Sequence, residues 1–245
     1  MPDDGGTRPI FELRGVGVDY NTPTGAVTGI DDVTLDVPAR GITVLAGPSG
    51  SGKSTLLRVL GLFERPARGQ VLFRGADTGE LGHAARRGLR RDHLGLVFQN
   101  PTDNLLDYLS VGKNLVAAAQ STGQHCDPDR ILDELGLAGT AGWRITALSG
   151  GQQQRLAFGC ALARRSTVVV ADEPTSQLDE QSADLVLDTL RMLARNGHCV
   201  VVASHDDRLI ELGGRIGWMG GGRLTDVECR TVPGDGAGRR LGDEP

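Results

Sequence analysis

The segment Gly47-Pro48-Ser49-Gly50-Ser51-Gly52-Lys53-Ser54-Thr55 decides the fold of this 245-residue chain. It matches the pattern G-x-x-x-x-G-K-[ST], follows the apolar run 42–46 and precedes a helix-like segment, 53–62. Glycines let backbone N–H groups curl around phosphate oxygens, and the start of the following helix adds a positive dipole. Lys53 is expected to reach the β- and γ-phosphates of a nucleotide, and the Ser54 hydroxyl to bind Mg²⁺. The sequence therefore predicts a strand–loop–helix unit that cradles phosphates.

Apolar strands alternate with helices on both sides of this phosphate loop. Strands are expected at 10–18, 32–37, 42–46, 70–73, 94–98, 168–171 and 199–204, and helices at 152–164 and 180–196. Between 100 and 146 only helices and loops are expected, with Ser110 and Asp127 at helix starts. Continuous apolar strands separated by helices predict an α/β fold with a mainly parallel sheet covered on both faces. The helical stretch is then an insertion into that core.

Side chains able to act on a phosphate follow three of the expected strands. Asp172 and Glu173 end the strand 168–171; Asp172 is expected to hold Mg²⁺ and Glu173 to orient or deprotonate an attacking water. His205 directly follows the strand 199–204, where a contact with the γ-phosphate is expected. Gln99 closes the strand 94–98, and its side-chain oxygen could ligate Mg²⁺. Spacing alone favours an ordinary polar strand end at Gln99.

A second glycine-containing segment, Leu148-Ser149-Gly150-Gly151-Gln152, precedes a helix. Ser149 is expected to cap that helix, and two glycines would otherwise be a costly choice at a helix start. A second anion-binding helix terminus fits this pattern. It cannot share the first phosphate site if it lies on the far side of the helical insertion.

Composition limits the other classes of protein. The formal net charge is −5, and no apolar run approaches the ~18 residues of a membrane helix. Mild acidity argues against bulk electrostatic binding of nucleic acid, so no nucleic-acid partner is expected. The start of the chain lacks the features of a secretory signal, and four dispersed cysteines indicate a reducing compartment without disulfides. Residues 1–8 and 229–245 are expected to be flexible tails.

Taken together, these motifs resemble the ATP-binding subunit of an ABC transporter, over residues 9–228. The resemblance implies a P-loop NTPase core at 9–99 and 148–228, with an N-terminal antiparallel β subdomain and an inserted α-helical subdomain at 100–147. It implies ATP and Mg²⁺ as cofactors and a homodimer, or a pair of such subunits. Each ATP would lie between the phosphate loop of one subunit and Ser149–Gly151 of the other.

The resemblance also assigns roles to single residues. It implies that Gln99 couples nucleotide state to an integral membrane permease, which would place the chain peripherally on the cytoplasmic face of the membrane. Ser176-Gln177-Leu178-Asp179 is similar to the loop that crosses the dimer interface, with Gln177 in place of a small residue. Tyr20 stands where the family stacks an aromatic ring on adenine; an ordinary strand-end tyrosine is the alternative. The residues expected to bind the nucleotide are Tyr20, Gly47, Pro48, Ser49, Gly50, Ser51, Gly52, Lys53, Ser54, Thr55, Gln99, Ser149, Gly150, Gly151, Gln152 and Asp179.

Within the family, the segments 99–106, 148–155 and 171–175 are most similar to the lipoprotein-release and macrolide-export ATPases, although amino-acid importer ATPases share much of them. The expected function is therefore ATP hydrolysis that powers a transporter, as an exporter or a lipoprotein- or peptide-type system. The alternatives are a soluble ABC ATPase acting on DNA or ribosomes, and a mechanical membrane role without transport. We interpret the cluster Arg86–Arg91 as a solvated helix face, with contact to a partner or to anionic lipid as the alternative.

Overall fold

The computed structural model describes residues 8–23 and 25–230. The strands are β1 (Phe11–Thr22), β2 (Gly25–Val37), β3 (Gly41–Ala46), β4 (Arg68–Phe73), β5 (Ala76–Asp77), β6 (Leu94–Val97), β7 (Val168–Asp172), β8 (Cys199–Ser204), β9 (Arg215–Gly220) and β10 (Arg223–Cys229). The α-helices are α1 (Lys53–Leu60), α2 (His83–His93), α3 (Val111–Gln120), α4 (Pro128–Glu134), α5 (Gly150–Ala163), α6 (Glu180–Arg195) and α7 (Asp207–Leu212). Short 3₁₀ helices are η1 (Pro101–Asn104) and η2 (Ile145–Ala147).

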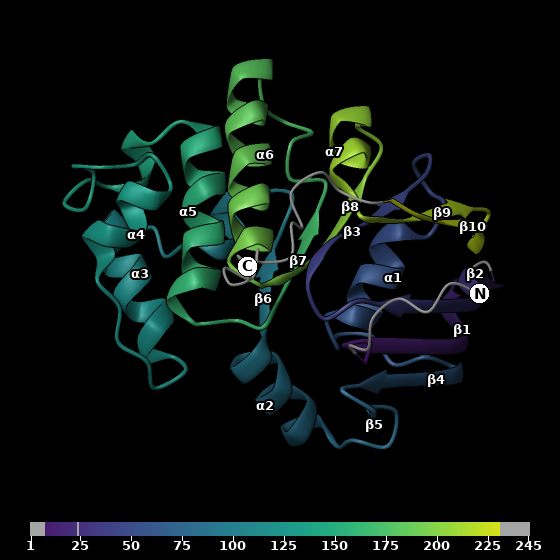
Figure 1. Cartoon of the computed structure of the whole chain (residues 1–245). Helices are drawn as coiled ribbons and strands as arrows, with labels where there is room; N and C mark the ends of the chain where they lie inside the picture. The colour runs from purple at the N-terminus through teal and green to yellow at the C-terminus, as the bar shows by residue number, and fades with distance from the viewer. Residues whose placement is uncertain (1–7, 24, 231–245) are drawn as a thin grey trace, which may run out of the picture.

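Two sheets form the framework of the molecule (Figure 1). The larger has the order β10-β9-β3-β8-β7-β6, and all its pairs are parallel except β9–β10. The smaller is antiparallel, with the order β2-β1-β4-β5. The expected α/β fold with a mainly parallel sheet and an N-terminal antiparallel sheet is confirmed.

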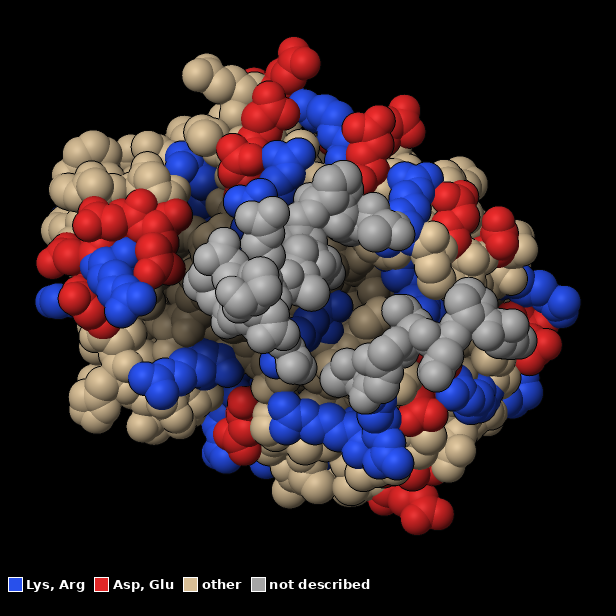
Figure 2. Space-filling view, viewed as in Figure 1, with Lys and Arg blue, Asp and Glu red and all other residues tan. Residues whose placement is uncertain are grey.

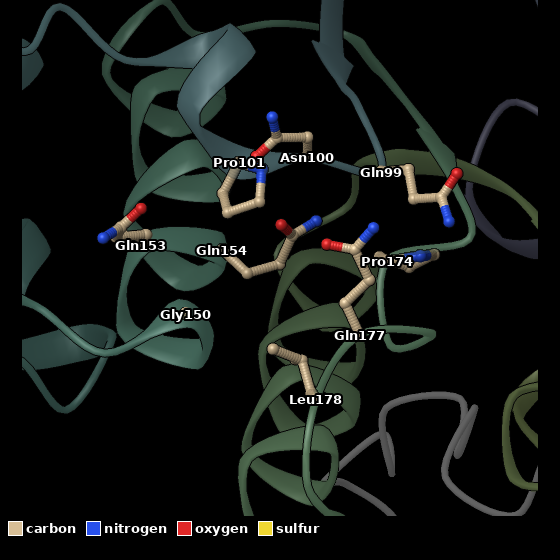
Figure 3. Close-up of a pocket in the computed structure, with 9 residues that line it drawn as sticks. All are labelled: Gln99, Asn100, Pro101, Gly150, Gln153, Gln154, Pro174, Gln177 and Leu178. Atoms are coloured by element: carbon tan, nitrogen blue, oxygen red, sulfur yellow. The ribbon is translucent and has the colours of Figure 1, made fainter.

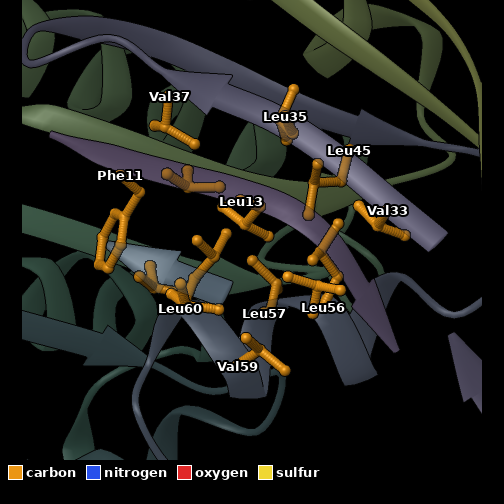
Figure 4. Close-up of a cluster of buried hydrophobic side chains, with 14 of the residues drawn as sticks. Phe11, Leu13, Val33, Leu35, Val37, Leu45, Leu56, Leu57, Val59 and Leu60 are labelled. Atoms are coloured by element: carbon orange, nitrogen blue, oxygen red, sulfur yellow. The ribbon is translucent and has the colours of Figure 1, made fainter. Parts of the chain in front are cut away.

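Helix α1 lies between the two sheets and joins them into one core. Its apolar side chains Leu56, Leu57 and Leu60 pack with residues of β1 and β2 on one side and with β3, β7 and β8 on the other (Figure 4). Burying each such side chain contributes about 1.5–3 kcal/mol. The start of α1, and with it the phosphate loop, is therefore held by the centre of the molecule.

The opposite face of the parallel sheet is covered by α5, α6 and α7. Strand β7 shows why both faces are apolar: Val168 and Val170 point into the core with α1, whereas Val169 and Ala171 pack under the other helices. Helices α3 and α4 pack against α5 and form a separate cluster of buried residues. The stretch between β6 and α5 is thus helical, with Ser110 and Asp127 as helix caps, as the sequence predicts.

The sequence missed or misplaced some elements. Helices α2 and α7 and strands β9 and β10 were not expected, and β1 and β2 are longer than predicted. The expected C-terminal tail begins too early, because Cys229 closes β10 and the Arg230 N–H donates to the Gly214 carbonyl at 2.7 Å. Residues 1–7 and 231–245 of the expected tails lie outside the described residues.

The solvated-face interpretation of the Arg86–Arg91 cluster is wrong for Arg86. Arg86 is only 3% exposed. Its guanidinium donates to the carbonyls of Thr78, Leu62 and Glu64 at 3.2, 3.0 and 2.6 Å. Burial lowers the pKa of Arg86. A planar fork of N–H donors suits several carbonyls at once, so this arginine packs α2 onto the segment after α1.

Charges of both signs are spread over the face drawn in Figure 2, with acidic side chains gathered over α4. The acidic residues of α4 and its cap are Asp127, Asp129, Asp133 and Glu134. Across residues 8–23 and 25–230, no helix combines the length and the apolar character needed to cross a membrane.

Candidate functional site

The carboxyl ends of three neighbouring strands meet at one edge of the parallel sheet. In the register of the sheet, Ala46 of β3 pairs with Ser204 of β8, and Asp172 of β7 pairs with Ala203. The phosphate loop and His205 directly follow β3 and β8, and the acid pair Asp172–Glu173 spans the end of β7. Ligands of open α/β sheets collect at such an edge.

Backbone geometry makes glycine necessary in the phosphate loop. Gly47 has a φ of 147°, and a Cβ atom there would lie 2.3 Å from the Met219 carbonyl oxygen of β9. Gly52, which precedes α1, has a φ of 98°. Residues that carry a Cβ atom rarely adopt such backbone conformations. The loop therefore lies directly on β9, with its backbone free of Cβ atoms where it turns.

Lys53 is held inside the loop rather than in solvent. The residue is 6% exposed, and its ammonium donates to the carbonyls of Gly47 and Pro48 at 2.6 and 2.9 Å. The same nitrogen lies 3.8 Å from Oε1 of Glu173. The hydroxyl of Ser51 is buried beside them without a hydrogen-bond partner among the described residues. A buried donor without a partner is costly, and a phosphate oxygen would satisfy it.

Asp172 is the buried member of the acid pair. Burial raises the pKa of its carboxyl group, and the neighbouring Glu173 adds to the rise, whereas a hydrogen bond from Ser54 and the charge of Lys53 oppose it. Its Oδ1 is buried with no hydrogen-bond partner in the described part of the chain. The carboxylate thus lacks a partner that a cation could provide.

Glu173 and His205 form a close pair. The His205 Nδ1 lies 2.9 Å from Oε1 of Glu173, and the buried Ser204 hydroxyl donates to Oε2 at 3.5 Å. Glu173 has a φ of 44°, in the left-handed region, and its N–H donates to the Ala203 carbonyl of β8 at 3.0 Å. The strained backbone directs the side chain toward the phosphate loop, so Glu173 meets both Lys53 and His205.

Tyr20 lies beside the same loop. Its hydroxyl donates to the Thr55 hydroxyl at 3.4 Å, and its ring lies against Gly29, where a Cβ atom would be 2.6 Å from the ring. The tyrosine of β1 is therefore next to the end of the phosphate loop. This position is compatible with both of the roles considered for it.

Two more of the predicted site residues, Gln99 and Gly150, lie at a second cavity. They line a cavity of about 170 Å³ together with Gln154, Gln177 and Leu178. The amides of Gln154 and Gln177 face each other there, whereas the amide of Gln99 points away from them (Figure 3). Among the described residues, no hydrogen bond or ion pair joins these cavity residues to the phosphate loop of the same chain.

Two other predicted site residues, Ser149 and Asp179, act as helix caps. Ser149 accepts from the Gln152 N–H at 3.3 Å, and the Gln152 side chain accepts from the Ser149 N–H at 2.9 Å. Asp179 accepts from the Ser182 N–H and hydroxyl at 2.9 and 2.7 Å, and these hydrogen bonds lower its pKa. In one subunit these side chains therefore start α5 and α6.

The sequence did not single out Ser204, which ends β8 fully buried and reaches Glu173. Its place as the polar residue at the end of the apolar run 199–203 is the sequence feature that indicates a site residue. Ser176 was noted only as part of an interface loop; in the structure it joins Gln99 to the backbone of Glu173.

Comparison with known proteins identifies the family. Residues 30–176, more than half of the chain, match the family described as ABC transporter. The macrolide export ATP-binding/permease protein MacB 1/2 of Paracoccus denitrificans is 36% identical over 221 residues, covering 88% of this chain and 33% of that protein. MacB of Rhodopseudomonas palustris is 37% identical over 247 residues, covering 96% of this chain and 36% of that protein. The chain spans about a third of the length of these curated relatives.

Solved structures agree with this match. The ATP-binding cassette MJ0796, in a dimeric post-hydrolysis state bound to ADP and Pi, has a TM-score of 0.80 and 28% identity, covering 91% of this chain and 99% of that one. The expected likeness to macrolide-export ATPases is confirmed by the curated relatives. From its phosphate loop, its fold and these relatives, the chain belongs to the ABC transporter family, as one of its ATP-binding ATPase domains.

Proposed function

We propose that this domain hydrolyses ATP on its phosphate loop and thereby powers a membrane transporter. The observation that carries the proposal is the meeting of Lys53, Glu173 and His205 at the carboxyl edge of the sheet, with Oε1 of Glu173 at 3.8 Å and 2.9 Å from the other two. A cation, a base and an imidazole at one strand edge are the groups that phosphoryl transfer to water requires.

Each of these side chains has a definite part in the reaction. The Glu173 carboxylate accepts a proton from the attacking water and fixes its direction in line with the bond that breaks. The Lys53 ammonium, already anchored on the loop carbonyls, neutralises charge that develops on the γ-phosphate. His205 lies with Nδ1 at 2.9 Å from Glu173; as an imidazolium it would donate from Nδ1 to that carboxylate and from Nε2 to a γ-phosphate oxygen.

The chain also fits Mg²⁺ beside the nucleotide. Mg²⁺ prefers oxygen ligands and keeps several positions for phosphates and water. The unpartnered Oδ1 of Asp172 and the Ser54 hydroxyl are such oxygens. Gln99, which follows the neighbouring strand β6, would offer an amide oxygen. Among the described residues no three His, Cys, Asp or Glu side chains cluster into a metal cage, so phosphates would complete the shell. Held by these residues, the ion would neutralise negative charge on the phosphates.

Two copies of the domain complete the site. MJ0796 is a dimeric cassette, and in this chain Ser149–Gly151 begins α5 away from its own phosphate loop. We infer a head-to-tail dimer in which Ser149, Gly150, Gly151 and Asp179 of one subunit close over ATP held by the other. A helix N-terminus with two glycines offers N–H donors to the γ-phosphate.

A permease subunit is the proposed partner. Exposed apolar side chains lie close to Gln99 in the sequence: Phe98, Leu106 and Tyr108 are 40%, 40% and 77% exposed. The Phe98 ring lies 6.4 Å from that of Phe63, which is 46% exposed. Exposed apolar clusters mark protein interfaces. The MacB relatives are named ATP-binding/permease proteins, which supports an export function on the cytoplasmic face of a membrane.

Replacing Glu173 by glutamine tests the ATPase proposal. We expect Glu173→Gln to lower kcat for ATP by about 10²- to 10⁴-fold, because the amide cannot accept the proton of the water. ATP binding is retained, so the variant accumulates as an ATP-bound dimer in size-exclusion chromatography. Glu134→Gln on α4 is the matched control and keeps wild-type turnover. Undiminished turnover of Glu173→Gln would refute the assignment of the base.

Purification of Glu173→Gln from its native membranes with MgATP in mild detergent tests the partner. We expect a polytopic membrane protein to copurify, and its recovery to fall when Leu106 and Tyr108 are both changed to serine. The same double change in the wild-type chain is expected to leave ATPase activity intact. Recovery with nucleic acid or ribosomes alone would contradict transport and leave only the ATPase chemistry.

A further inference from the structure

We propose that Ser176 is a positioning residue that joins the side chain of Gln99 to the backbone of Glu173. This inference rests on the proposed function, since it concerns the orientation of the proposed base. Gln99 stands at the start of the helical insertion, and Glu173 stands at the phosphate loop. Ser176 is then the link by which the first sets the position of the second.

A continuous chain of hydrogen bonds carries the proposal. The Gln99 Nε2 donates to the Ser176 hydroxyl at 3.1 Å, and that hydroxyl donates to the Glu173 carbonyl at 3.0 Å. The Ser176 N–H donates to the same carbonyl at 3.2 Å. A hydroxyl has one proton and two lone pairs, so it can accept from the amide and donate to the carbonyl at once. The donor and acceptor roles along this chain are therefore compatible. Hydrogen bonds that are linked in this way polarise and strengthen one another.

The backbone of Glu173 needs this support. Its φ of 44° is disfavoured for a residue with a Cβ atom and persists only when neighbouring contacts hold it. On one side its N–H is fixed to Ala203 of β8; on the other, its carbonyl is fixed by both groups of Ser176. Releasing the carbonyl lets the peptide relax and moves the carboxylate away from Lys53 and His205.

Gln99 is itself tied to the insertion. Asn104 of η1 donates to the Leu96 carbonyl at 2.6 Å and accepts from the Phe98 N–H at 2.8 Å, which fixes the chain on either side of the strand end. The Gln154 side chain of α5 donates to the Phe98 carbonyl at 3.4 Å. A displacement of η1 or α5 against the sheet therefore moves Gln99, and through Ser176 it changes the orientation of Glu173.

Steady-state kinetics on Ser176→Ala test the link. We expect kcat for ATP to fall about 3- to 10-fold, the value of one lost hydrogen bond, while KM and the melting temperature stay at wild-type values. Ser176→Thr keeps the hydroxyl and restores kcat. Ser121→Ala, which removes a hydroxyl bonded to the Ala118 carbonyl on α3, is the matched control without effect on kcat. A raised KM with unchanged kcat would overturn the proposal.

A double-mutant cycle separates a link from two independent roles. Adding Ser176→Ala to Gln99→Ala is expected to lower kcat less than about 2-fold further, because the chain is already broken. Full multiplication of the two single effects would overturn the proposal. Amide hydrogen exchange without nucleotide gives a readout independent of turnover: the N–H of Ser176 is expected to exchange faster in Gln99→Ala. Unchanged exchange there would also contradict the link.

The dimer provides the last control. In the Glu173→Gln background, Ser176→Ala is expected to leave the ATP-bound dimer intact in size-exclusion chromatography, because the link lies within one subunit. Loss of the dimer would place Ser176 at the interface and overturn the proposal. A wild-type chain without ATPase activity would instead refute the proposed function itself, so the two failures are distinguishable.

Discussion

Lys53 illustrates how single residues are specified by the shape of the site rather than by charge alone. The chain contains only two lysines, Lys53 and Lys113, among 26 basic residues, so arginine is its usual cation. At position 53 the ammonium fits between two carbonyls of a loop that closes around it. At position 86 a guanidinium spans three carbonyls, two in the segment after α1 and one at Thr78. Each site takes the cation whose donors match its acceptors.

Lys53→Arg is therefore expected to fail although it keeps the charge. The planar guanidinium is larger than the ammonium and has no room at a residue that is 6% exposed. ATP affinity, measured by isothermal titration calorimetry, is expected to fall at least about tenfold, equivalent to about 1.4 kcal/mol. Lys113→Arg, on the exposed side of α3, is the matched control and binds ATP normally. Normal ATP affinity in Lys53→Arg would count against the loop assignment.

Helices and strands could be predicted from the sequence where a pattern of apolar residues specifies them. The strands β3, β7 and β8 are continuous apolar runs followed by polar residues, and their carboxyl ends place the site. Helix α2 escaped prediction because it has almost no apolar stripe: arginine N–H groups on backbone carbonyls, not hydrophobic burial, attach it. The link through Ser176 was equally invisible, since Gln99 and Ser176 are distant in the sequence and meet only through the β6–β7 pairing.

The bulge in the pairing of β1 with β4 leads to a prediction about the stability of the antiparallel sheet. A Cβ atom on Gly69 would lie 2.2 Å from the Gly15 carbonyl oxygen, and Gly69 has a φ of 78°. Gly69→Ala is expected to lower the free energy of unfolding by about 1–3 kcal/mol, measured by urea denaturation. Gly88→Ala on α2 meets nothing within 4 Å and is expected to change stability in the opposite direction, by up to about 1 kcal/mol. Equal effects of the two variants would contradict this packing.

On the scale of the whole molecule, one core joins both sheets through α1, and a second lies under α5, α6 and α7. The four cysteines differ in exposure: Cys199 is buried in β8, Cys126 and Cys160 are half-buried, and Cys229 is exposed on β10. Burial raises the pKa of the Cys160 and Cys199 thiols to about 12. The thiolate is the reactive form, so packing makes these two residues inert.

Alkylation with iodoacetamide at pH 8 is expected to report this packing. In the native protein Cys229 is modified, whereas Cys160 and Cys199 stay unmodified because pH 8 lies far below their pKa values. In urea all four thiols react, which mass spectrometry of the digested protein would detect. Modification of Cys199 as fast as Cys229 in the native state would contradict the buried position of β8.

The order of strands in the parallel sheet also governs when the molecule can be assembled during its own synthesis. Strand β3, which carries the phosphate loop, ends at Ala46, but its neighbours β8 and β9 begin only at Cys199 and Arg215. At about 5–20 residues per second, ribosomes need roughly 8–30 s to make the chain that separates β3 from β8. Throughout that interval the apolar strand remains unpaired, so the nascent chain cannot yet bind ATP and depends on protection against aggregation.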